Sequence, residues 1–124
     1  MQEKDRKVAR QRLDVEMRPY RQAARNKDAT QELLKTTRRA LNIPLGEIAE
    51  KLGVAISTVT DREEREGNGK ITLRAMSQMA RAMGCRVVYG IVPARGKTLE
   101  ELAEERLWAK VLGVEKQQVS RLAS

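Results

Sequence analysis

The small and apolar residues around Gly53 constrain the fold of this chain more than any other feature of its sequence. Ile48 and Ala49 precede this glycine at helical spacing, and Val54 and Val59 follow it. A small residue such as Ala49 lets a second helix cross closely, and glycine readily adopts the left-handed backbone conformation that ends a helix. The pattern therefore predicts two short helices joined by a tight turn, with Val54 and Val59 filling the wedge between them.

Apolar residues at helical spacing predict further helices on both sides of this pair. The helices expected in the centre of the chain run from about Thr30 to Leu41, Pro44 to Leu52, Ile56 to Glu66 and Thr72 to Met83. The glycines that flank Asn68 should end the third of them, and Thr72 is a suitable N-cap for the fourth. A chain of 124 residues is expected to build one hydrophobic core from these helices.

The two ends of the chain have a different character. Residues 1–28 are charged and only weakly periodic, and Pro19 should break or kink their helix. The β-branched run Arg86–Val92 predicts one short strand, and a capping box at Thr98 opens a C-terminal helix. The fold class expected is mainly α: a helix-turn-helix bundle with an N-terminal helical arm, one short β-strand and a C-terminal helix.

A lone strand leaves a row of unpaired backbone donors and acceptors. Pairing with the same strand of a twofold-related copy would satisfy them, so we expect a homodimer. The alternative is an extended connection that packs against the chain's own helices. Three segments are expected: a basic helical arm at 1–28, a helix-turn-helix domain at 29–83, and a strand plus helix for dimerisation at 84–124.

The charge of the chain favours a polyanionic partner. It has 25 lysines and arginines against 17 aspartates and glutamates, a formal net charge of +8 and a sequence pI of about 10.1. Such a balance is typical of nucleic-acid binding, although a merely solvated surface is the alternative. One tryptophan and two tyrosines are too few for a base-stacking platform, so the expected nucleic acid is double-stranded DNA.

The residues that the chain lacks narrow its chemistry. It has no histidine, and Cys85 is its only cysteine, so neither an internal disulfide nor a multi-cysteine zinc site is expected. We recognise no nucleophile–base pair and no phosphate-cradling glycine loop. We therefore expect no enzyme, no metal and no cofactor. The apolar runs are too short for a membrane helix or a signal peptide, and a cytoplasmic location without membrane contact is expected.

The motif from Ile48 to Thr60, with the helices before and after it, resembles a known family. It is similar to the helix-turn-helix of the phage-repressor-like, xenobiotic-response-element family over about residues 30–83. The flanks resemble a subfamily called mobile mystery protein A, and the segments that carry this likeness are Arg12–Asp14, Met17–Pro19, Glu66–Leu73, Gly84–Tyr89 and Val92–Pro93. Members of that subfamily are typically encoded beside a Fic-domain protein, so the resemblance implies such a protein as a partner.

The resemblance also implies roles for individual residues. Ile56, Ser57 and Asp61 should face base edges: Ile56 on a thymine methyl, Ser57 on either base type, and Asp61 accepting from a cytosine amino group. The residues expected nearer the DNA backbone are Thr58, Thr60, Lys70 and Thr72, and the arginines expected at phosphates are Arg38, Arg39, Arg62 and Arg65.

Several positions depart from the family pattern. Leu45 stands where a polar residue usually opens the second helix, Ala55 where a serine or threonine usually caps the third, and Asp61 where arginine or lysine is common. Base recognition has therefore shifted, or DNA binding has weakened. The acidic residues Asp61, Glu63, Glu64 and Glu66 are alternatively a solvated face paired to neighbouring arginines, or a protein-binding surface.

Two functions follow as expectations. The first is a sequence-specific DNA-binding transcriptional regulator that autoregulates the operon of a Fic-type toxin–antitoxin-like pair. The alternative is an antitoxin or adaptor that acts mainly by protein–protein contact with a Fic-domain partner. Tight binding to upstream operator DNA would favour the first, and a stoichiometric complex that is indifferent to DNA would favour the second.

Overall fold

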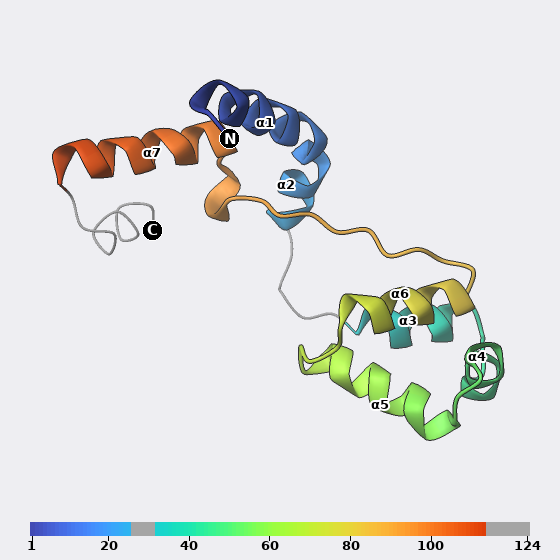
Figure 1. The fold of residues 1–124 in the computed structure, drawn as a ribbon. Coiled ribbons are helices and arrows are strands. Elements are labelled where there is room, and N and C mark those ends of the chain that lie inside the picture. The colour runs from blue at the N-terminus through green and yellow to red at the C-terminus, as the bar shows by residue number, and fades with distance from the viewer. Residues whose placement is uncertain (26–31, 114–124) are drawn as a thin grey trace. The chain divides into compact units, whose positions relative to one another are not determined.

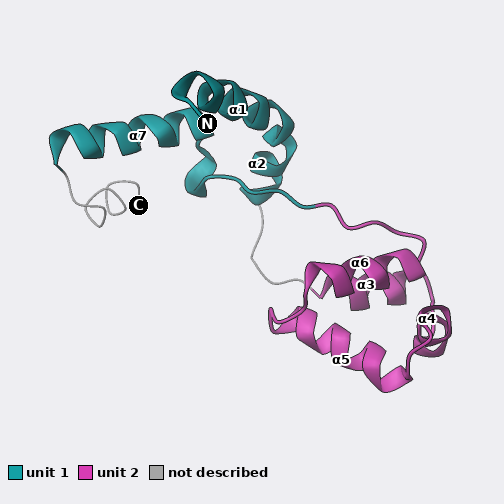
Figure 2. Cartoon of the chain, in the orientation of Figure 1, with its two compact units in different colours: residues 1–27, 89–124 teal, residues 28–88 magenta. Residues whose placement is uncertain are grey.

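The computed structural model describes residues 1–25 and 32–113, and this part of the chain is mainly helical, as predicted (Figure 1). The contacts divide the chain into two compact units (Figure 2). Unit 1 combines residues 1–27 with residues 89–124, and unit 2 is the continuous stretch 28–88. The two ends of the chain therefore belong to the same unit, with unit 2 inserted between them in sequence.

Unit 2 contains the helices α3 (Leu33–Ala40), α4 (Leu45–Leu52), α5 (Ile56–Gly67) and α6 (Leu73–Ala82). Gly53 ends α4 with a φ of 67°, in the left-handed conformation that the sequence pattern predicted. Thr72 caps α6, because its Oγ1 accepts a hydrogen bond from the backbone N–H of Ala75 at 3.0 Å. The helix start predicted at Thr30 lies outside the described residues, and α3 is described from Leu33.

The core of unit 2 receives side chains from all four of its helices. Leu34 of α3 is buried, and Ile48 of α4, Val59 of α5 and Met79 of α6 are fully buried. Val54, in the turn between α4 and α5, is half-buried and packs against this cluster, and its backbone N–H donates to the carbonyl of α4. The wedge predicted between these two helices is therefore present.

Two glutamates of α5 hold α3 against this core. The carboxylate of Glu66 accepts hydrogen bonds from the backbone N–H groups of Leu33 at 3.0 Å and Leu34 at 2.7 Å. It therefore caps the start of α3 from another helix, where a negative charge also complements the helix dipole. Glu63 accepts from Nε of Arg38 at 2.6 Å and from its Nη2 at 3.2 Å, a bidentate ion pair that links α3 to α5.

Unit 1 contains α1 (Glu3–Glu16), α2 (Arg18–Ala24), a single 3-10 turn η1 (Ala94–Gly96) and α7 (Leu99–Leu112). The break expected near Pro19 is present, because α1 ends at Glu16 and this proline lies in the first turn of α2. None of these four elements contains a buried residue. Unit 1, in its described part, is therefore held together without a closed hydrophobic core.

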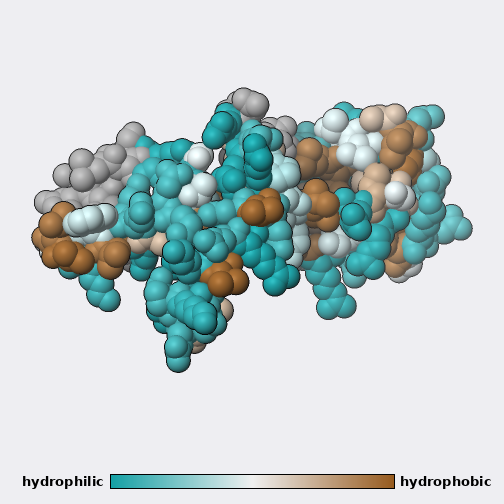
Figure 3. All heavy atoms as spheres, turned by 90° about the horizontal axis from the view of Figure 1, so that it is seen from above, coloured by the Kyte–Doolittle hydropathy of each residue, from teal (hydrophilic) through white to brown (hydrophobic). Residues whose placement is uncertain are grey.

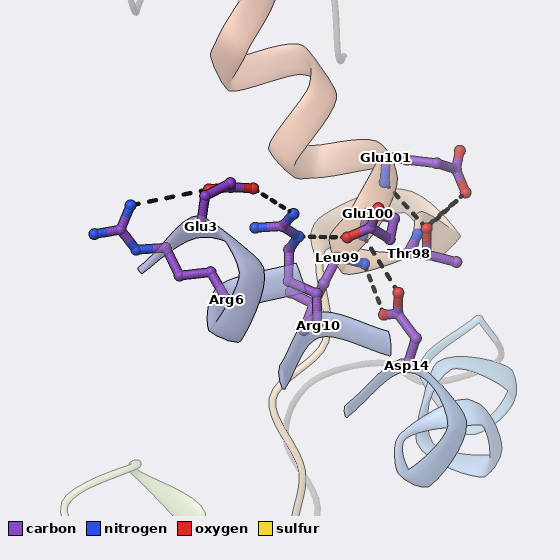
Figure 4. A network of polar contacts seen from close by, with 8 residues as sticks. All are labelled: Glu3, Arg6, Arg10, Asp14, Thr98, Leu99, Glu100 and Glu101. Atoms are coloured by element: carbon purple, nitrogen blue, oxygen red, sulfur yellow. Dashed lines mark hydrogen bonds and ion pairs between the residues drawn. The ribbon is translucent and has the colours of Figure 1, made fainter. Parts of the chain in front are cut away.

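Polar groups join α1 to the start of α7 (Figure 4). The carboxylate of Asp14 accepts hydrogen bonds from the backbone N–H groups of Leu99 at 2.8 Å and Glu100 at 3.3 Å. Thr98 adds the predicted capping box, because its Oγ1 accepts from the backbone N–H of Glu101 at 3.1 Å. The first turn of α7 thus has its free N–H groups satisfied by α1 and by its own cap.

Arg10 of α1 forms a second link between these helices, with an ion pair to Glu100 and another to Glu3 at 2.9 Å (Figure 4). The hydrogen bond and the charge of Arg10 lower the pKa of the Glu3 carboxyl below its ordinary value. A carboxyl with a lowered pKa stabilises the folded state above its ordinary pKa and loses this contribution as the pH falls through the lowered value. The Arg10–Glu3 pair within α1 therefore persists into mildly acidic solution.

The prediction of a strand at Arg86–Val92 is wrong. These residues have no regular secondary structure, and no strand occurs in the described residues. A β-branched run becomes a strand only beside a second strand, and the described chain offers none. At Gly90 the chain passes so close to unit 1 helices that a Cβ would lie 2.8 Å from Sδ of Met17 and 2.9 Å from Cγ of Tyr20. The segment is a connection without regular structure that lies against the chain's own helices at Gly90, while Val88, Tyr89 and Ile91 are 64–83% exposed.

Candidate nucleic-acid interface

The face of α5 that points away from the core is the candidate surface. Helical periodicity turns Val59, Glu63 and Glu66 inward, so the residues between them point outward. The exposed side chains of α5 are those of Ile56, Ser57, Thr60, Asp61, Glu64 and Arg65. The first turn of this face is neutral, and the following turns carry two carboxylates and one guanidinium.

All three residues predicted to face base edges lie on this surface. Ile56 is 52% exposed at the start of α5, as Leu73 is at the start of α6 with 51%. Ser57 is exposed beside it. The carboxylate of Asp61 already accepts a hydrogen bond from Nε of Arg65 at 2.8 Å, one helical turn further on. If Asp61 contacts a base, its carboxylate therefore does so while paired with the guanidinium of Arg65.

The four arginines predicted at phosphates are not equally available. Arg38 is occupied inside unit 2, because it pairs with Glu63 and its Nη1 donates to the carbonyl of Ile43 at 3.2 Å. Arg62 is half-buried and donates to Oε1 of Gln78 at 3.1 Å, which joins α5 to α6. Arg39 is exposed and takes part in none of the ion pairs found among the described residues. Arg38 therefore stabilises the fold of unit 2, and Arg39 stays a candidate for contact with phosphate.

The residues expected near the DNA backbone occupy three places. Thr60 is exposed on α5, whereas Thr58 is half-buried. Lys70 is exposed in the loop between α5 and α6, where its backbone N–H donates to Oδ1 of Asn68 at 3.2 Å. Thr72 is exposed at the start of α6, and its hydroxyl keeps a proton to donate while its oxygen caps the helix.

The sequence reasoning missed the roles of Glu63 and Glu66. Both were grouped with Asp61 as parts of one acidic face, yet they are only 8% and 9% exposed. A signal for their position existed, since they follow Val59 by four and seven residues and so continue the buried stripe of the helix. Their partners on α3 carry no comparable signal, because the pairing depends on how the two helices cross.

Comparison with protein-family models, with curated proteins and with solved structures finds no match for this chain. Across residues 1–25 and 32–113, the structure contains no cluster of three or more acidic or cysteine side chains that could hold a metal ion. No helix in the same residues is both long and apolar enough to cross a membrane. Function is therefore inferred from the surface geometry and the sequence.

Proposed function

We propose that this protein is a sequence-specific DNA-binding transcriptional regulator in which α4 and α5 act as a helix-turn-helix of the repressor-like kind. One observation carries the proposal. Ile48 and Val59 anchor the two helices in a closed core, while Ile56 and Ser57 at the start of α5 are turned out to solvent. A rigidly held helix with an exposed N-terminal turn is suited to the major groove, where the first residues of a recognition helix contact base edges.

Charge and the surrounding surface support the same proposal. The net charge of +8 favours association with a polyanion. Arg39, Lys70 and Thr72 are exposed groups that can donate hydrogen bonds to phosphate. In this proposal they fix the position of the protein on the duplex, and Ile56, Ser57 and Asp61 supply sequence preference. The carboxylates on α5 make binding weaker than the net charge alone suggests.

The biological setting of this proposal comes from the sequence resemblance. A regulator encoded beside a Fic-domain protein would bind its own promoter in the cytoplasm and control both genes. We therefore propose autoregulation of a Fic-type toxin–antitoxin-like operon.

Binding to the protein's own promoter should be specific and should weaken as salt is raised. Replacing Arg39 with alanine should weaken binding to every duplex and reduce the slope of log affinity against log salt by about 1. Ser57→Ala should instead change the preferred base at one position, with a discrimination of about 1–3 kcal/mol. Fluorescence anisotropy with promoter and random duplexes, at several salt concentrations, measures both effects.

A matched control is Arg12→Ala, which removes an exposed arginine of α1 in unit 1 and should leave the base preference unchanged. The proposal fails if the wild-type protein shows no preference for its own promoter over random duplex. It also fails if all three variants change binding in the same way, because the α5 surface would then have no distinct role.

A second candidate function is an antitoxin or adaptor that acts by contact with the Fic-domain protein. The observation that favours it is the acidic part of the α5 surface, where Asp61 and Glu64 are exposed and only Arg65 balances them. Phosphates repel such a surface, whereas a basic protein surface would attract it. A stoichiometric complex that survives nuclease treatment and is weakened by Glu64→Lys would support this function.

We also infer that the protein is a homodimer, with α7 as the contact. The second half of α7 exposes the apolar side chains Leu107, Trp108, Val111 and Leu112, each 60–66% exposed, and hydrophobic surface gathers at that end of the helix in Figure 3. The first half is acidic and the second half carries Arg106 and Lys110. Antiparallel pairing of two copies would cover the apolar face and bring opposite charges together.

Trp108 is the only tryptophan, so its fluorescence reports on this contact directly. At tens of micromolar we expect light scattering to give the mass of a dimer and the emission to be blue-shifted, with a red shift on dilution. Leu107→Lys should give a monomer, because a charge cannot be covered by the apolar face of the partner. Val15→Lys, which changes an exposed valine of α1, is the control and should leave the dimer intact. A wild-type monomer with a solvent-exposed tryptophan spectrum would contradict this inference.

A further inference from the structure

A cavity in unit 1 is lined by three arginines, and the described residues of its wall include no carboxylate. Arg21 and Arg25 come from α2 and the residue that follows it, and Arg95 comes from η1. The rest of the lining consists of Gly96 together with alanine, valine and proline side chains. Figure 1 shows η1 beside the end of α2, so residues about seventy positions apart in the sequence form one wall.

One of these guanidinium groups is held by a hydrogen bond to the backbone, and a second, on the exposed Arg25, lies against a glycine. Nη1 of Arg21 donates to the carbonyl oxygen of Asp14 at 2.7 Å, and the Arg21 side chain is only 13% exposed. The guanidinium of Arg25 lies against Gly96, where a Cβ would come within 3.2 Å of its Nε and 3.4 Å of its Nη2. A glycine at this position therefore leaves the room that Arg25 occupies.

The third arginine has an unfavourable backbone conformation. Arg95 has a φ of 71° and a ψ of 31°, in the left-handed region that residues with a Cβ rarely adopt. Such strain persists only where the surrounding structure enforces it, and it is found most often at binding sites. Glycine would adopt the conformation of Arg95 without strain, so the arginine side chain is retained there at a cost in stability.

Among the residues that the structure describes, Asp14 is the one carboxylate that pairs with an arginine of the cavity. Oδ1 of Asp14 lies 3.8 Å from Nη1 of Arg21, but both oxygens of this carboxylate already accept hydrogen bonds from the start of α7. The neighbouring Lys97 is paired with Glu105. Arg25 and Arg95 take part in no ion pair found among the described residues. An anion placed in the cavity would be attracted by the arginines that line it.

We propose that this cavity is a binding site for a phosphate group. The planar guanidinium presents paired N–H donors that match two oxygens of a phosphate, and several of them together suit a tetrahedral oxyanion. Two sources share this chemistry: a phosphodiester of the DNA backbone and a free phosphate or phosphate monoester. The site is made by unit 1 alone and needs no contribution from α5, so it stands whether or not α5 reads DNA.

The first test is a calorimetric titration of the full-length protein with inorganic phosphate, at constant ionic strength and with chloride as the reference anion. We expect saturable binding with a stoichiometry of one. Arg25→Gln should weaken it at least tenfold, and Arg12→Gln, which changes an exposed arginine elsewhere in unit 1, should leave it unchanged. Absence of binding to the wild-type protein, or an equal loss in both variants, would overturn the proposal.

Arg95→Gly separates loss of the site from loss of the fold. This variant relieves the left-handed strain, so its melting temperature without phosphate should equal or exceed that of the wild type. Its phosphate binding should still fall at least tenfold. Unchanged phosphate binding in Arg95→Gly would remove this residue from the site and contradict the proposal.

Duplex binding by the same variants identifies the source of the phosphate. If the site holds the DNA backbone, Arg25→Gln should weaken all duplexes alike, and inorganic phosphate should compete with DNA at constant ionic strength. If the site holds a free phosphate, Arg25→Gln should lose phosphate binding while its affinity for duplexes stays that of the wild type. Failure of promoter specificity alone would contradict the role of α5 and leave this site intact.

Discussion

Replacing Glu63 with alanine should lower the free energy of unfolding of unit 2 by about 3–5 kcal/mol, because it leaves the Arg38 guanidinium buried without its partner. The Arg38 and Glu63 side chains are only 11% and 7% exposed. Water therefore cannot replace the lost carboxylate, and α3 also loses one of its two polar links to α5. Urea denaturation followed by circular dichroism measures the change.

The matched control is Asp61→Ala on the same helix. Asp61 and Arg65 form an ion pair of similar length, 2.8 Å, but their side chains are 55% and 56% exposed. Exposed pairs contribute at most about 1 kcal/mol, since water solvates both charges when the pair is broken. A loss of similar size in the two variants would show that burial does not decide the strength of the Arg38–Glu63 pair.

The second large effect is expected at Ile48. Ile48→Ala should lower the free energy of unfolding by about 2–5 kcal/mol, because it removes buried apolar surface and leaves a cavity between four helices. The Ile48 side chain is completely buried, and the helices around it are close-packed. Thermal unfolding with matched urea titrations checks this result.

Ile56 provides the comparison that separates stability from recognition. It is the same residue type on the next helix, but it is 52% exposed. Ile56→Ala should change stability by no more than about 0.5 kcal/mol, as is usual for exposed positions, and should change which duplex the protein prefers. If Ile56→Ala destabilised unit 2 as strongly as Ile48→Ala, the outward placement of α5 would be contradicted.

The helix pair was predictable because its determinants are local. Gly53 ends α4 whatever lies elsewhere in the chain, and Thr72 caps α6 with an atom three residues away. The lack of a strand at Arg86–Val92 was not predictable in this way, since β structure depends on a neighbouring strand and not on propensity alone. A glycine in the middle of that run, Gly90, was the sign of a close backbone approach instead.

The candidate surface on α5 was also predictable only in part. The family resemblance implied an outward-facing role for Ile56, Ser57 and Asp61, and all three are exposed. It could not show that Arg38 turns inward, because its partner Glu63 lies 25 residues further along the chain. The arginine-lined cavity was equally hidden, since α2 and η1 meet only when the two ends of the chain come together.

The insertion of unit 2 between the two segments of unit 1 bears on how the protein folds during synthesis. Unit 2 is continuous, so it can close its core while the ribosome is still translating. Helix α1 leaves the ribosome first but meets α7 only after roughly 4–17 s of further elongation. During that interval a folded unit 2 is flanked by an unpartnered helix that is rich in charged side chains of both signs and carries few apolar ones.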